Sequence, residues 1–257
     1  MIVALFILIL VCLALIMYIK AQNTKLAESR RSESIKVAFL KGLSREIRTH
    51  LHSVSGMAEI ISKEDLYLSK SEKRNITTQI KFNTSLISTL LDELSILSDE
   101  HGGHQLKDER FSPNMLCKRC IDANLSFVHE GVRLSFRSEL SDTVFVEADY
   151  HIIELIMNKL VGASCQFTMK GEITLGCRRG DPSNLLIFFV QDSGGATIPE
   201  ARKAVLFRWF DNPDENSEPT EFDLSVAQRL ARKVGGDLRY DESWTKGTRM
   251  EFILPVR

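Results

Sequence analysis

The first nineteen residues, Met1 to Ile19, carry no charged side chain, and Lys20 is the first ionised residue of the chain. A helix of this length rises about 28 Å, close to the thickness of a bilayer's hydrocarbon core, about 30 Å. The segment lacks the basic start and the small-residue cleavage site of a signal peptide. We therefore expect a transmembrane helix over residues 1–19.

Basic residues outnumber acidic ones directly after this segment. From Lys20 to Lys41 there are six lysines and arginines against two acids, Glu28 and Glu33. Because basic flanks stay on the cytoplasmic side of a membrane, we expect the C-terminal bulk of a single-pass protein in the cytoplasm. Residues 20–33 are interpreted as a basic juxtamembrane helix or linker, with no room for an extracellular sensor domain.

The composition is that of an ordinary folded protein. The chain has 257 residues, a net charge of −1, 44% hydrophobic and 26% charged residues, which argues against disorder, collagen and a disulfide scaffold. A near-neutral charge gives no reason to expect nucleic-acid binding. Cys117 and Cys120 form a CxxC without a second ligand pair, so we expect thiols and no metal site.

Two long amphipathic helices follow. Apolar residues recur at helical spacing over residues 23–62, and again over residues 72–98 beyond a polar turn. Two such helices joined by a short turn form an antiparallel hairpin, and apolar stripes this wide favour a dimeric four-helix bundle. We expect an all-α dimerising hairpin over residues 34–99 and a polar linker over residues 100–110.

Residues 111–257 change to short strands and helices and predict an α/β sandwich, one sheet under one helical layer. The strand over residues 185–191 is too apolar for a sheet edge and should be central. The other expected elements are strands at residues 133–136, 144–147, 172–177, 239–241 and 249–254 and helices at residues 150–164, 200–207 and 225–234.

At this point the chain resembles the cytoplasmic half of bacterial sensor histidine kinases, over about residues 34–257. Residues 39–51 resemble the phosphoacceptor box, commonly F-x-x-x-x-S-H-E-I-R-T-P-L. The other matching segments, in chain order, are Asp149 with residues 158–168 and 170–173 (asparagine box and next strand), 192–199 (first glycine box), 207–210 (F-box), and 229–236 with 246–252 (last helix and hairpin).

The resemblance implies a hairpin that dimerises and carries the phosphoacceptor, followed by an ATP-binding domain of the GHKL type. It also implies ATP and Mg²⁺ as cofactors, a response regulator as partner, a homodimer or a mixed dimer with another kinase, and the bacterial inner membrane. In relatives the aspartate matching Asp192 accepts a hydrogen bond from the adenine amino group. The other residues that the resemblance places at the nucleotide are Asn158, Lys170, Gly194, Phe207 and Thr248.

The departures from the family pattern fall on the chemistry. Arg45 stands where the phosphoacceptor histidine belongs, and a guanidinium offers donors but no nitrogen lone pair. His50 replaces the usual proline, about 140° around the helix from Arg45. His52 lies on nearly the same face as Arg45, about 10 Å along the axis. His52 is either a substitute acceptor or a solvated polar residue.

The nucleotide motifs depart in the same direction. Ala163 aligns with the asparagine that helps hold Mg²⁺ in relatives, and a methyl group offers this hard ion no oxygen. Lys159 takes the place of the box's leading asparagine, one residue after Asn158. Residues 219–224 align with the glycine-rich segment that surrounds the phosphates in relatives, but they contain no glycine. Residues 211–223 carry six acids and no base, which repels a triphosphate unless the acids hold a metal in a rewired site.

Glu46 and Thr49 keep the spacing that, in relatives, positions a water to dephosphorylate the response regulator. At i and i+3 they share one side of a helix. The alternative is that this segment only keeps a docking surface.

Taken together, the motifs and their departures lead us to interpret the chain as a membrane-anchored, degenerate histidine kinase of two-component signalling. It binds a response regulator or a partner kinase, and a phosphatase role is an alternative that Glu46 and Thr49 leave open. The rival interpretations are a working ATP-dependent histidine kinase with an atypical site and an ATPase-like regulator without two-component partners.

Overall fold

The computed structural model describes residues 2–63, 67–98, 106–182, 184–193, 207 and 219–256, with the side chains of residues 2–16, 21, 25, 27–32, 34–36, 98 and 219–222 outside this description. The chain divides into two units, Met1–Glu46 and Ile47–Arg257. The first unit is the N-terminal part of helix α1, which runs over Ile2–Ser62. No helix is long and apolar enough to cross a membrane in the described part of the chain. The backbone of residues 2–19 belongs to α1, but most side chains of this segment are not described, so the transmembrane segment over residues 1–19 stays a prediction.

In the second unit, the end of α1 is followed by α2, Lys70–Ser98. Helix α2 starts two residues before the expected position because Ser69 and Glu72 form a reciprocal capping box. The Ser69 hydroxyl accepts from the Glu72 backbone N–H at 3.2 Å, and the Glu72 carboxylate accepts from the Ser69 N–H at 2.8 Å. His50 of α1 lies 3.0 Å, Nδ1 to Oδ1, from Asn83 of α2.

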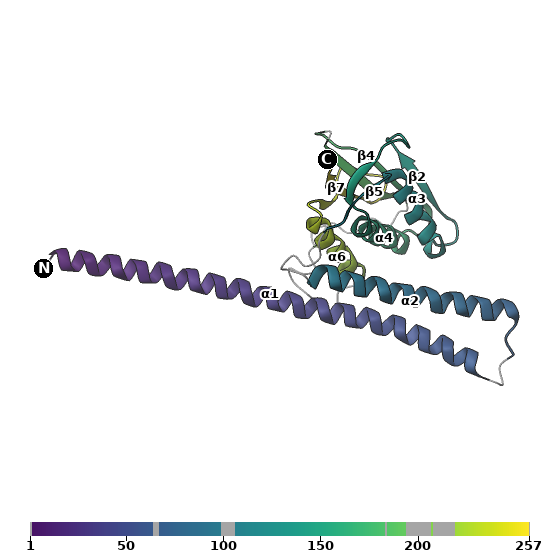
Figure 1. Ribbon diagram of the computed structural model, residues 1–257, viewed down its shortest axis with the longest axis horizontal. Coiled ribbons are helices and arrows are strands. Elements are labelled where there is room, and N and C mark those ends of the chain that lie inside the picture. The colour runs from purple at the N-terminus through teal and green to yellow at the C-terminus, as the bar shows by residue number, and fades with distance from the viewer. Residues whose placement is uncertain are drawn as a thin grey trace. The chain divides into compact units, whose positions relative to one another are not determined.

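The rest of the unit is an α/β domain (Figure 1). Its elements are β1 (Asp108–Phe111), α3 (Pro113–Asn124), the 3₁₀ turn η1 (Leu125–Phe127), β2 (Val132–Ser138), β3 (Val146–Asp149), α4 (Tyr150–Phe167), β4 (Gly171–Arg179), β5 (Leu185–Asp192), α6 (Pro219–Lys233), β6 (Asp237–Tyr240) and β7 (Arg249–Pro255).

Five strands form the main sheet in the order β2-β4-β5-β7-β6. The β2–β4 pair is parallel and the other pairs are antiparallel. Helices α3, α4 and α6 cover one face, where Phe188 and Phe252 stack with ring centroids 5.9 Å apart and are fully buried. The apolar strand expected to be central is β5, and it lies in the middle of the sheet as predicted.

The structure also differs from the expected single sheet. Strands β1 and β3 form a separate antiparallel ladder, and β1 begins at Asp108, inside the expected linker. Helix α3 was not predicted. It has Pro113 at its first turn directly after Ser112, a normal helix start, but its 12 residues present only a short apolar stripe. The expected helix over residues 200–207 lies outside the described residues apart from Phe207, which is in a turn.

The cysteines of α3 are buried free thiols, as are Cys165 and Cys177. Burial is the main reason that the pKa of Cys120 rises to about 12 and that of Cys165 to about 11. Cys120 and Cys165 therefore act as small apolar core residues, and both cysteines of the CxxC are buried free thiols.

Candidate functional site

Asp192, at the end of β5, is tied to the start of β7. Its backbone N–H donates to the Thr248 carbonyl at 2.9 Å, and its Oδ1 accepts from the Thr248 N–H at 3.3 Å. The Trp244 indole N–H lies 3.4 Å from the Asp192 carbonyl. Asp192 and Thr248 are both buried, at 5% and 4% exposure. The structure therefore brings together two residues that the resemblance assigns to the nucleotide, and it fixes the orientation of the carboxylate.

Gly247 is required by this arrangement. Its φ is +147°, and a Cβ there would collide with the Asp192 backbone carbonyl and lie 2.7 Å from the Asp192 carboxylate. Only glycine permits both the backbone conformation and the close approach. The Asp192 carboxylate is thus held by a glycine-dependent contact between two strands.

A second cluster centres on Lys159 of α4. Its ammonium lies 3.0 Å from Glu93 Oε1 of α2 and 2.6 Å from Asp223 Oδ1 of α6. The Lys159 side chain is 11% exposed and that of Glu93 is 1% exposed, whereas Asp223 is 36% exposed. One lysine therefore joins three helices that are far apart in the sequence, and we call these three residues the Lys159 clamp.

Glu93 is the unusual member of the Lys159 clamp. Burial raises the pKa of its carboxyl, and the neighbouring Lys159 ammonium only partly offsets this effect. Neither carboxylate oxygen has a well-aligned hydrogen bond among the described groups. The ionised Glu93 carboxylate therefore depends on the Lys159 ammonium, because an unpaired buried charge is strongly unfavourable.

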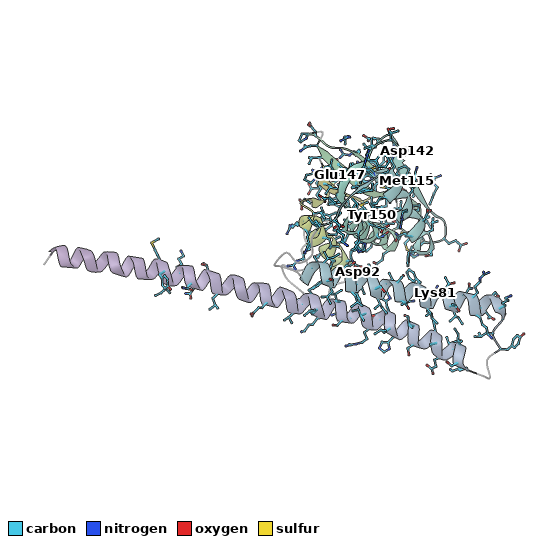
Figure 2. The ribbon with its side chains drawn as sticks, viewed as in Figure 1. Lys81, Asp92, Met115, Asp142, Glu147 and Tyr150 are labelled. Carbon is cyan, nitrogen blue, oxygen red and sulfur yellow. The ribbon has the colours of Figure 1, made fainter. Side chains whose placement is uncertain are left out.

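Further contacts join α2 to the α/β domain. Asp92, labelled in Figure 2, lies 3.9 Å from the His151 ring. The Lys233 ammonium of α6 donates to the Ile96 carbonyl near the C-terminal end of α2. Phe82 and the Phe127 ring of η1 lie 4.7 Å apart between centroids. Glu93 is therefore held against α4 by contacts on both sides of it along α2.

The asparagine-box residues of α4 point to structural roles. The Asn158 side-chain oxygen accepts from Asn124 of α3 at 2.9 Å, so it holds two helices together. Ala163 is buried at 4% exposure. The hydroxyls of Ser164 and Thr168, near the end of α4, are buried without a hydrogen-bond partner among the described groups.

The remaining nucleotide candidates add less. Lys170 is exposed and Phe207 is half-buried. Gly194 and most of the acidic segment 211–223 lie outside the described residues. Residues 219–224, the segment aligned with the family's glycine-rich cradle, all lie at the start of α6, so this segment is helical here.

The phosphoacceptor segment lies within α1. Arg45, Thr49 and His52 are exposed, and Glu46 is half-buried. His50 contacts Asn83, which is 7% exposed and donates to the Gln79 carbonyl of its own helix. His50 therefore has an interhelical role, whereas the predicted roles of Arg45, Glu46, Thr49 and His52 stay predictions.

The described residues suit the adenine end of a nucleotide better than its magnesium-bound phosphate end. A buried carboxylate acceptor at Asp192 suits the amino group of adenine. The Lys159 ammonium, however, is already paired with two carboxylates, and Ala163 supplies no oxygen for a magnesium ion. This donor set does not suit a magnesium-bound triphosphate, so no chemical step is derived through one.

Sequence reasoning missed Glu93, one of the two carboxylates of the Lys159 clamp. The signal was present: Glu93 lies at i+3 from Leu90 and i−4 from Leu97, within the apolar stripe of α2. A charge in such a stripe requires a partner from another element. Its partner could not be identified, because Lys159 is 66 residues away and belongs to another domain.

Comparison with known proteins agrees with this geometry. Residues 148–257 match the family described as histidine kinase-, DNA gyrase B-, and HSP90-like ATPase. The chain is 27% identical over 248 residues to the sensory/regulatory protein RpfC of Xanthomonas campestris pv. campestris, covering 93% of this chain and 34% of RpfC. It is 28% identical over 236 residues to the sensor protein TorS of Escherichia coli K12, covering 90% of this chain and 25% of TorS.

Among solved structures, full-length ShkA in complex with AMPPNP is similar in fold, with a TM-score of 0.57 and 22% identity, covering 84% of this chain and 45% of ShkA. The fold and the Asp192 cluster define a GHKL-type ATPase domain. Residues 148–257 match the histidine kinase-, DNA gyrase B-, and HSP90-like ATPase family, and the chain is similar to sensor histidine kinases over most of its length, as the sequence motifs predicted. It spans about a third of the length of RpfC and a quarter of that of TorS.

Proposed function

We propose that this chain is a degenerate histidine kinase of two-component signalling, anchored in the bacterial inner membrane by residues 1–19 and dimeric through its two long helices. It binds a response regulator or a partner kinase and does not autophosphorylate. The observation that carries this proposal is the Lys159 clamp, in which an internal ammonium already satisfies two carboxylates at the leading position of the asparagine box. Arg45 at the acceptor position supports it independently.

Phosphoryl transfer depends on positioning and on neutralising the charge of the phosphates. At the Lys159 clamp the cation is engaged, and its partners are anionic groups that repel phosphate. We therefore expect magnesium-bound ATP to bind weakly or not at all, and adenine recognition by Asp192 to contribute little by itself.

Calorimetric titration of the full chain with ATP and magnesium tests this proposal. No heat of binding at millimolar nucleotide is expected. The matched variant Glu93→Gln/Lys159→Asn/Ala163→Asn removes the clamp and restores both asparagines, so it should bind ATP more tightly than the wild type. Micromolar, magnesium-dependent binding to the wild-type chain would overturn the proposal.

The intact Asp192 cluster favours the alternative, a working kinase with an atypical site. Incubation of the chain with γ-labelled ATP separates the two interpretations. A labelled phosphate that is acid-labile, and that is absent from the His52→Ala variant, supports a working kinase. A chain that takes up no label supports the degenerate form.

A phosphatase role rests on Glu46 and Thr49 and needs no phosphohistidine. The test is the half-life of the phosphate on a phosphorylated response regulator with and without the chain. Shortening by the wild type and not by Thr49→Ala supports this role, and an equal half-life with both leaves only docking.

A further inference from the structure

The face of the main sheet opposite α3, α4 and α6 has a gap in one row of side chains. Neighbours across the strands in this row are Arg137, Gly176, Phe189 and Glu251. A Cβ at Gly176 would collide with the Arg137 carbonyl and lie 2.6 Å from the Phe189 ring. Gly176 therefore lets the Phe189 ring lie close to the backbone of β4, where another residue would place its own side chain.

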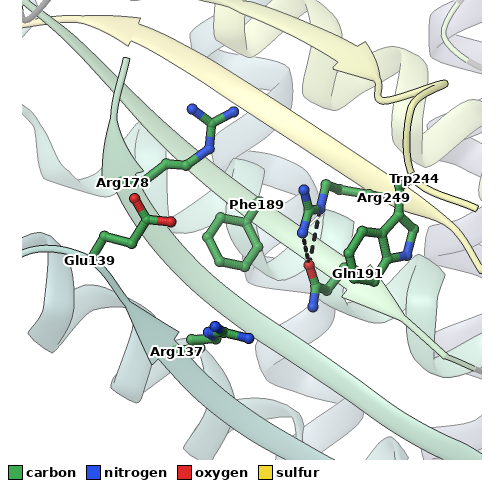
Figure 3. Close-up of a pocket in the computed structure, with 7 residues that line it drawn as sticks. All are labelled: Arg137, Glu139, Arg178, Phe189, Gln191, Trp244 and Arg249. Atoms are coloured by element: carbon green, nitrogen blue, oxygen red, sulfur yellow. Dashed lines mark hydrogen bonds between the residues drawn. The ribbon is translucent and has the colours of Figure 1, made fainter. Parts of the chain in front are cut away.

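A cavity of about 260 Å³ lies on this face of the sheet, beside the Phe189 ring (Figure 3). Its lining includes three arginines and one glutamate, and two of these arginines are paired with carboxylates, Arg178 with Glu251 and Arg249 with Asp241. Phe189, 6% exposed, supplies an aromatic surface. Strands β2, β4, β5 and β7 all contribute, together with Trp244 from the segment before β7. The cavity combines an aromatic ring with a cationic rim on a rigid sheet.

One wall of the cavity is fixed. The Arg249 guanidinium lies 4.0 Å from the Trp244 ring centroid and 5.4 Å from that of Phe189. It donates from Nε and from its terminal nitrogen to Gln191 Oε1. Because Oε1 is engaged, the amide orientation of Gln191 is set, and its Nε2 donor is directed away from Arg249 (Figure 3).

The opposite wall offers a second donor. Arg137 is exposed and has no ion pair within 4.0 Å among the residues that the structure describes. Arg178, in contrast, lies 2.8 Å from the buried Glu251 carboxylate. Arg137 is thus the lining arginine best able to bind an added anion, since a guanidinium matches the geometry of a carboxylate.

We propose that this cavity binds a small monocarboxylate with a flat, unsaturated body. The flat body stacks on the Phe189 ring, and the carboxylate accepts from the Arg137 guanidinium and the Gln191 Nε2. The cavity is smaller than the roughly 300–1,000 Å³ of sites for drug-sized ligands, which suits a single ring. Glu139 at the rim disfavours a second carboxylate.

The cavity lies one residue away from the Asp192 cluster on both strands. Gln191 precedes Asp192, and Arg249 follows Thr248. Consecutive residues of a strand point to opposite faces of the sheet. A ligand bound in the cavity therefore contacts the same strands that position Asp192, but on the opposite face of the sheet. Trp244 contacts both places, so its fluorescence is a direct reporter of occupancy.

The test is a fluorescence titration of the full chain carrying Trp209→Phe, which leaves Trp244 as the sole indole of the two tryptophans. Sodium benzoate is the probe, with benzamide and inorganic phosphate as comparison ligands. We expect saturable quenching by benzoate with a dissociation constant of about 1 mM or below, as a ligand of so few atoms permits.

Arg137→Gln and Gln191→Glu should each weaken benzoate binding at least tenfold, while Arg179→Gln, an exposed arginine of β4 outside the lining, should leave it unchanged. The proposal is overturned if benzoate gives no saturable response, if Arg179→Gln weakens binding as much as Arg137→Gln, or if benzamide or phosphate binds equally well. Circular dichroism confirms folding of each variant, and if Arg137→Gln does not fold, Gln191→Glu decides.

Discussion

Replacing Lys159 by methionine leaves the Glu93 carboxyl, 0% exposed as a residue, without its cation. Removing one partner of a buried ion pair typically costs about 3–5 kcal/mol. Here the cost has a ceiling, because Glu93 can take up a proton instead. Protonating a carboxyl of ordinary pKa 4.5 at pH 7.5 costs about 4 kcal/mol at about 1.36 kcal/mol per unit. We therefore expect Lys159→Met to lower the free energy of unfolding by about 3 kcal/mol at pH 7.5.

The pH dependence follows from the raised pKa of Glu93. A carboxyl whose pKa rises on folding binds more protons in the folded state, so its contribution to stability is complete below pH 4.5 and is lost as the pH rises through the folded pKa. Lys159→Met raises this pKa further. The destabilisation should therefore shrink as the pH falls from 7.5 toward 4.5, by at most about 1.4 kcal/mol per pH unit.

Thermal unfolding of the full chain in mild detergent, at pH 7.5 and 5.0, measures this effect. At about 2–4 °C per kcal/mol, the expected fall in Tm at pH 7.5 is about 6–12 °C. Lys170→Met is the control, because Lys170 is exposed. The double variant Lys159→Met/Glu93→Gln should recover most of the loss. An unchanged Tm for Lys159→Met, or an equal loss at both pH values, would refute the reasoning.

Three further predictions concern the fold and the site. Gly247→Ala should destabilise the chain by at least about 2 kcal/mol in urea unfolding, since its Cβ collides with the Asp192 carbonyl; an unchanged midpoint would contradict the strand contact. Ser69→Ala should raise amide exchange in the first turn of α2 about fivefold, because it removes the capping hydroxyl; equal exchange would show that the cap is unimportant. Burial and a pKa of about 12 should protect Cys120 from iodoacetamide at pH 8 until the chain unfolds, as followed by mass spectrometry; rapid labelling of the native chain would contradict its burial.

The fold was predictable where one pattern determines one element. The uninterrupted apolar run at residues 186–190 identified the central strand, because such a sequence is too apolar for an exposed strand at the edge of a sheet. Helix α3 was missed because its stripe is short, although Ser112 followed by Pro113 marks a helix start. The separate β1–β3 ladder pairs residues about 40 apart, and its four-residue strands carry too little pattern to recognise.

Site residues could be predicted from the sequence where a family motif identifies each residue by itself. Asp192 and Thr248 were identified from motif spacing, and the structure brings them into contact. The Lys159 clamp was not, because it depends on three helices whose contacts are not local. Only the position of Lys159 in the asparagine box could be recognised from the sequence.

The mutual dependence of Lys159 and Glu93 also constrains which substitutions the site tolerates. Replacing Lys159 by asparagine alone would leave Glu93 as a buried carboxyl without a cation, so this single change lowers the stability of the fold. Neutralising Glu93 first removes the buried charge that requires the lysine. The two positions lie on different helices, so the pair is exchanged without a large loss of stability only when the substitutions come in that order.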